Sequence, residues 1–149
     1  MMLRTHVILA LVVGLALLES VTHRVSFLPL LILATLLPDL DTANSYLGKH
    51  SVFRPFQWFT RHRGLLHSLT FCFVASAVFA FFVPVVALPF FLGYGLHLFA
   101  DSMTVEGIRP LWPAKWETRG LLHTGSAAEA GIFYVLCGIC IVLAILITV

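Results

Sequence analysis

Long apolar runs separated by short polar stretches dominate the pattern of hydrophobic and polar positions along this chain. Five runs are apolar enough to cross or deeply enter a bilayer, at residues 7–21, 27–37, 65–83, 88–100 and 127–149. A helix needs about 20 residues to cross a bilayer perpendicularly, so we expect the second and fourth runs to be short or partly re-entrant. The pattern predicts an all-α fold, a polytopic membrane helical bundle of about five helices.

The composition agrees with this pattern. Of the 149 residues, 60% are hydrophobic and only 11% are charged, whereas soluble domains are about half apolar and a quarter charged. So much apolar surface excludes a disordered chain, and we expect residues 1–149 to form a single integral membrane domain. The net charge of +2 is too small to indicate a nucleic-acid partner.

The nine lysines and arginines lie almost entirely on one side of the predicted bundle. If the five runs alternate in direction, eight of the nine share a side with the N-terminus, and Arg24 alone lies on the other side. Because loops rich in lysine and arginine stay in the cytoplasm, we expect a multi-pass membrane protein with a cytoplasmic N-terminus.

Ionisable side chains within or beside the apolar runs collect at that same side. Odd-numbered runs carry them at their starts and even-numbered runs at their ends, so all of them reach the cytoplasmic face. These residues are His6, Asp39, Asp41, His62, His67, His97, Asp101 and Glu129. Ionisable groups at membrane depth are costly and by default mark a functional site, so the pattern predicts one shared site.

Imidazole and carboxylate groups suggest that this site binds metal ions. His97 and Asp101 are four residues apart and project from one face of a helix. Asp39, Asp41 and Asp101 lie at helix C-termini, where the helix dipole disfavours negative charge, and they need positive charge nearby. Four histidines and four carboxylates exceed one tetrahedral site, so we expect two or three divalent ions, Zn in the first instance and Mn or Fe as alternatives.

Taken singly, these residues also have structural interpretations. A lone histidine at a helix start, such as His6, is more often an interfacial residue than a ligand. Ser126 and Glu129 fit a capping box at the start of the last helix. Asp39 and Asp41 are typical turn formers after a proline.

The charged and aromatic loop residues favour a partner at the membrane surface. The cations near the predicted ligands are Arg61, Arg63, Lys115 and Arg119. Arginine pairs bidentately with phosphate, which fits a phosphate-bearing substrate, but these cations fit contacts with membrane lipid head groups equally well. Trp112 and Trp116 are typical of an interfacial aromatic belt.

Five stretches carry a family resemblance, namely THVILALVVG, LLPDLDTANSYLGK, HRGLLHSL, GYGLHLFADSMTVEGIRPLWP and TGSAAE. They resemble the YdjM/YbcI family of bacterial inner-membrane proteins, a family of predicted metal-dependent hydrolases, over nearly the whole chain. More distantly, the order of histidines and acids is similar to the zinc-dependent phospholipase C and nuclease group. That likeness implies, as metal ligands, His6, Asp39 or Asp41, His62 or His67, His97, Asp101 and Glu129.

The resulting hypothesis is a membrane-embedded metal-dependent hydrolase that cleaves a phosphoester of a lipid or of another membrane-surface substrate with a metal-activated water. We expect one of Asp39, Asp41 or Glu129 to accept the proton of the attacking water, and Arg63 to stabilise the developing phosphate charge. The alternative is a metal-ion transporter or a metal-binding scaffold without catalysis. Transport needs polar groups near the midplane and on both sides of the pathway, whereas the outer half of this chain has few, which favours the hydrolase.

Overall fold

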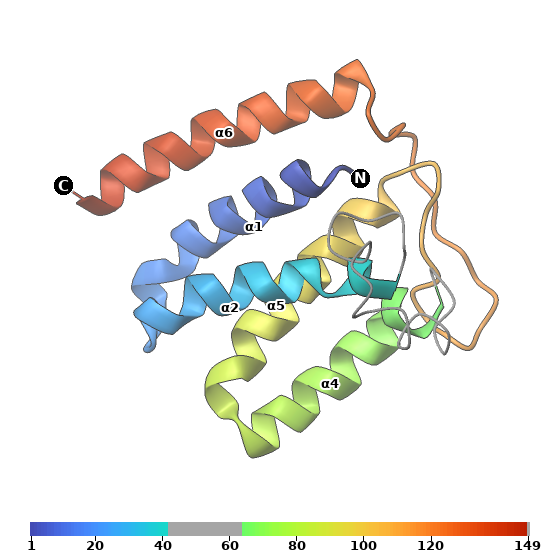
Figure 1. Cartoon of the computed structure of the whole chain (residues 1–149), viewed down its shortest axis with the longest axis horizontal. Helices are drawn as coiled ribbons and strands as arrows, with labels where there is room; N and C mark the ends of the chain where they lie inside the picture. Colours follow the sequence, from blue (N-terminus) through green and yellow to red (C-terminus); the bar gives the residue numbers. More distant parts are fainter. Residues whose placement is uncertain (42–63, 149) are drawn as a thin grey trace.

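The computed structural model of the chain describes residues 1–41 and 64–148, which form a bundle of five α-helices (Figure 1). The helices are α1 (Leu3–Leu17), α2 (Arg24–Leu36), α4 (Leu69–Phe82), α5 (Pro84–Ser102) and α6 (Ala127–Thr148). Short 3₁₀ turns follow the first two helices and precede α4, at η1 (Leu18–Ser20), η2 (Pro38–Asp41) and η4 (Leu65–His67). The predicted all-α fold is confirmed.

Successive helices run in alternating directions. The starts of α1, α4 and α6 and the ends of α2 and α5 therefore lie at one end of the bundle, and the loop of residues 103–126 lies there too (Figure 1). Helix α5 packs against α2 and α4, while α1 packs against α2 and α6. This arrangement brings the starts of the odd apolar runs together with the ends of the even ones, and we call this end of the bundle the site end.

The lengths of the helices differ in part from the prediction. Helices α5 and α6, and α1 together with η1, are long and apolar enough to cross a membrane. Helix α2 has 13 residues and is short, as predicted, but α5 has 19 because it begins at Pro84. A proline in the first turn of a helix costs little, since the N–H that it lacks would have no intrahelical acceptor there. Because α5 begins at Pro84, only Val83 lies between α4 and α5.

Close approach of α2 and α5 holds the centre of the bundle together. Buried apolar side chains from α2, α4 and α5 form one core cluster, which includes Tyr94 and Leu98. Gly93 lies where the two helices meet, and a Cβ added there would be 2.2 Å from the carbonyl oxygen of Leu31 and 3.0 Å from Thr35 Oγ1. The absence of a side chain at position 93 thus sets the spacing of the helices that carry the site.

We expect Gly93→Ala to destabilise the bundle by about 1–3 kcal/mol, the usual cost of forcing extra atoms into a packed interior. Gly95→Ala is the matched control, because a Cβ at Gly95, two residues further along the same helix, meets nothing within 4 Å. Thermal unfolding of the two variants in the same detergent measures the difference. Equal unfolding temperatures for both would contradict the close contact at Gly93.

Candidate metal centre

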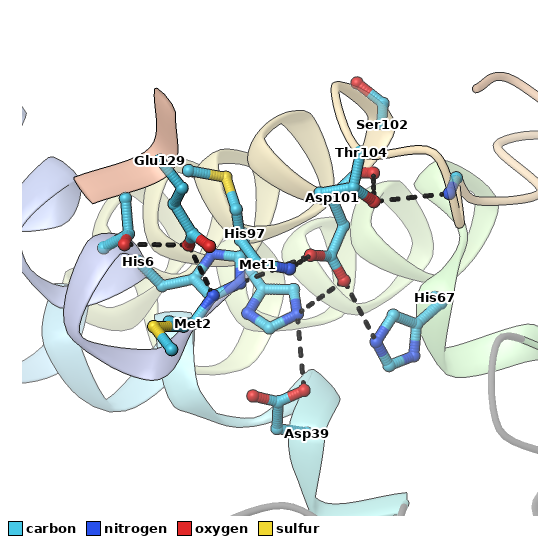
Figure 2. A network of polar contacts seen from close by, with 12 residues as sticks. Met1, Met2, His6, Asp39, His67, His97, Asp101, Ser102, Thr104 and Glu129 are labelled. Carbon is cyan, nitrogen blue, oxygen red and sulfur yellow. Dashed lines mark hydrogen bonds and ion pairs between the residues drawn. The ribbon is translucent and has the colours of Figure 1, made fainter. Parts of the chain in front are cut away.

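Five of the predicted ligands gather in one cluster at the site end (Figure 2). They come from four elements, since His6 lies on α1, Asp39 on η2, His67 on η4, and His97 and Asp101 on α5. The side chains of the three histidines are 1% exposed, that of Asp101 is 6% exposed and that of Asp39 is 21% exposed. Asp39 therefore lies on the open side of an otherwise buried cluster.

Local sequence explains how the two short turns present their ligands. Helix α2 ends before Pro38, because proline disfavours helical geometry in the residue before it, and η2 then places Asp39 beside His97. At the other turn, the Ser68 hydroxyl accepts a 3.1 Å hydrogen bond from Phe71 N and caps α4. The Tyr94 hydroxyl of α5 donates to the Leu66 carbonyl, which holds η4, and with it His67, against α5.

The separations between ligand atoms fit a shared cation. Asp101 Oδ1 lies 3.3 Å from His6 Nε2, and Asp101 Oδ2 lies 3.6 Å from His97 Nε2 and 3.9 Å from His67 Nε2. His97 Nε2 is also 3.7 Å from Asp39 Oδ1. These distances exceed an ordinary N–H···O hydrogen bond, whereas ligand atoms at the corners of a tetrahedron around zinc lie about 3.3 Å apart.

One hydrogen bond fixes how His97 faces the cluster. Its Nδ1 is 2.8 Å from the carbonyl oxygen of Thr35, in the last turn of α2, where carbonyls have no helical partner. Because a carbonyl oxygen only accepts, Nδ1 carries the proton and Nε2 points its lone pair into the cluster. The ring of His6 stacks on that of His97, with centroids 4.1 Å apart.

The cluster contains buried polar atoms that the described residues do not satisfy. Within residues 1–41 and 64–148, His6 Nδ1 and His97 Nε2 have no hydrogen-bond partner. A buried nitrogen without a partner costs on the order of 1–3 kcal/mol. Asp101 also attracts positive charge, since its Oδ1 is 2.6 Å from the amino nitrogen of Met1. A cation bound between the imidazoles and the carboxylates would satisfy His97 Nε2 and neutralise Asp101.

Glu129 is buried at the site end but has a different set of partners. Its Oε1 accepts hydrogen bonds from Met2 N at 2.7 Å and Thr5 Oγ1 at 2.9 Å, and its Oε2 accepts one from Gly125 N at 2.6 Å. Its own backbone N–H donates to Ser126 Oγ, as a helix cap requires. Among the described residues, the two groups close enough to hold an ion are His6, His97 and Asp101, and Asp39, His67 and His97. The carboxylate of Glu129 therefore ties the start of α6 to the start of α1.

Three predicted site residues cannot be placed in the cluster. Asp41 ends η2, but its side chain is not described, and His62 and Arg63 lie outside the described residues. Two supporting residues, Thr35 and Tyr94, were not predicted. Tyr94 precedes His97 by three positions and so shares its helix face, a signal that the sequence does contain. The role of Thr35 depends on a backbone carbonyl, which no side-chain pattern reveals.

Comparison with known proteins identifies related sequences. The family model "YdjM inner membrane protein" matches residues 1–149. The "Inner membrane protein YdjM" of Escherichia coli (strain K12) and that of Shigella flexneri are each 38% identical over 100 residues, which cover 61% of this chain and 51% of the relative. The chain thus spans about half the length of the curated relatives that it matches. No solved structure matches the chain.

We expect Glu129→Gln to lower the free energy of unfolding by about 1–3 kcal/mol. Both carboxylate oxygens of Glu129 now accept hydrogen bonds, whereas the side-chain nitrogen of glutamine cannot accept one, so at least one donor would lose its partner. Glu19→Gln is the control for the same chemical change, since Glu19 pairs with Arg24 at an exposed position, where ion pairs contribute little. Thermal unfolding in detergent measures both. Loss of bound metal from Glu129→Gln without loss of stability would instead support the predicted role of Glu129 as a ligand.

Proposed function

Because the chain belongs to the YdjM inner membrane protein family, we propose that it is an inner-membrane, metal-dependent hydrolase that cleaves a phosphoester at the membrane surface. The observation that carries the proposal is the buried cluster, in which three imidazoles and two carboxylates hold their ligand atoms 3.3–3.9 Å apart. Buried imidazole and carboxylate groups from several helices are expensive to assemble in an apolar bundle unless they serve a function.

The donor set suits a divalent transition metal. His6, His97 and Asp101 form one group of ligands, and Asp39 and His67 share His97 with it. Since Nδ1 of His97 is bonded to Thr35, Nε2 remains to bind a single ion. The five residues thus accommodate at least one ion, with Zn as the first choice and Mn or Fe as alternatives. The two or three ions that we expect require the full set of eight predicted ligands.

A bound divalent ion would polarise a phosphoryl oxygen and lower the pKa of a coordinated water. Asp39 is the most exposed carboxylate of the cluster, so it is placed to accept a proton from an attacking water. Asp101 would share the ion with His6 and His97, whose Nε2 atoms lie 3.3 and 3.6 Å from its two oxygens. Glu129, with three donors on its carboxylate, is less suited to proton transfer than Asp39. Arg63 stays a predicted contact of the substrate phosphate.

The orientation in the membrane follows from the loop charges. The termini lie at opposite ends of the bundle (Figure 1), as five alternating helices require. Of the five lysines and arginines within the described residues, four lie in α1 near its start or in the loop of residues 103–126, at the site end, namely Arg4, Arg109, Lys115 and Arg119. The positive-inside rule therefore supports a metal centre at the cytoplasmic face. A substrate drawn from the inner leaflet would reach Asp39 from that side.

The first test is metal content. Protein purified without chelator is expected to contain at least one zinc ion per chain, and Asp101→Asn to weaken zinc binding by at least about tenfold, a change typical of damage to a metal site. His23→Asn is the control, because His23 is exposed at the opposite end of the bundle. Elemental analysis and competition with a chromogenic chelator measure both. Metal-free wild-type protein would refute the proposal.

The second test is turnover of phospholipid in proteoliposomes. Chelation should abolish release of the phosphorylated head group, and added zinc should restore it, whereas Asp39→Asn should reduce turnover about 10²–10⁴-fold, the usual contribution of a general base. Cation uptake into the same proteoliposomes is the control for the alternative function. Uptake without head-group release would identify a transporter.

A further inference from the structure

An apolar groove of about 310 Å³ opens between α5, the start of α4 and the loop of residues 103–126. Its lining includes Gly95, Phe99 and Ser102 of α5, Leu69 of α4, and Leu111 and Trp116 of the loop. Successive residues on a helix are about 100° apart, so Gly95, Phe99 and Ser102 face a different side of α5 from His97 and Asp101. The groove is therefore separate from the metal centre.

The groove has space that residues 1–41 and 64–148 do not fill. A Cβ added at Gly95 meets nothing within 4 Å, and the side chains of Leu111 and Trp116 are 52% and 61% exposed at its edge. Since α5 is a candidate membrane span and the groove lies beside its last turns, hydrocarbon rather than water is the medium that suits this lining.

The loop beside the groove is positively charged. Residues 103–126 contain three cations, Arg109, Lys115 and Arg119, against two acids, Glu106 and Glu117, for a net charge of +1. Hydrogen bonds from Arg109 and then Arg119 lower the pKa of Glu117, so this acid stays ionised and offsets one cation. The excess positive charge is directly adjacent in sequence to Trp116 and Thr118, which line the groove.

We infer that this groove binds one acyl chain of an anionic phospholipid, whose phosphate contacts Lys115 and Arg119. The apolar groove would hold the acyl chain, and the adjacent cations would attract the negatively charged head group. Tryptophan at such a boundary places its ring among acyl chains and its N–H near head groups. This site requires neither a metal ion nor hydrolysis, so it stands or falls independently of the proposed function.

Fluorescence quenching of Trp116 by brominated acyl chains tests the inference. All measurements use a parent variant with Trp58→Phe and Trp112→Phe, in which Trp116 is the only tryptophan of the 149 residues. In vesicles of phosphatidylcholine, brominated phosphatidylglycerol should quench Trp116 at a lower mole fraction than brominated phosphatidylcholine does. The expected preference is about fivefold for each cation that contacts the phosphate.

Two variants test binding of the acyl chain and binding of the head group separately. Gly95→Leu fills the groove and should remove the preference, whereas Gly131→Leu, at another helical glycine whose Cβ meets nothing within 4 Å, should leave it unchanged. Lys115→Gln with Arg119→Gln should reduce the anionic preference but retain quenching by phosphatidylcholine. Equal quenching of the parent by both lipids would overturn the inference, and so would the same response of the two glycine variants.

Discussion

The carboxylate of Asp101 and the imidazoles that surround it impose the main constraint on this bundle. Three histidines and an aspartate are almost inaccessible to solvent in a chain that is 60% hydrophobic. Burying such groups costs several kcal/mol unless they interact with one another or with a cation. Because they come from separate helices and turns, the alternating helix directions and the close approach at Gly93 both contribute to their placement. The polar cluster and the apolar packing thus depend on one another.

The sequence predicts the gathering of the ligands better than it predicts the role of each one. The convergence of His6, His97 and Asp101 follows from hydropathy and from alternation of helix direction, which are strong signals in a membrane protein. The contacts of Glu129 do not follow, because they depend on how the residues before α1 and α6 meet in space. The start of α5 was misplaced for a local reason, since Pro84 is compatible with a turn and with the first position of a helix.

The candidate metal centre and the apolar groove lie on different sides of one helix. Helix α5 turns His97 and Asp101 towards the interior and Gly95 and Phe99 towards the groove, so one helix separates a buried polar cluster from an apolar groove. The loop of residues 103–126 joins the two regions. The Thr104 hydroxyl bonds to the Asp101 carbonyl at 2.7 Å, while Leu111 and Trp116 of the same loop line the groove.

The contact between Glu129 and the start of α1 has a consequence for biogenesis. Helix α6 packs on α1, and in chain order α6 follows α1, α2, α4 and α5. The hydrogen bonds to Met2 and Thr5 therefore form only after α2, α4 and α5 have been translated. His6, which follows Thr5 directly, contacts His97 and Asp101 of α5, so its own partners are translated before α6. A nascent chain that stalls before residue 127 would lack both of the Glu129 hydrogen bonds at the start of α1.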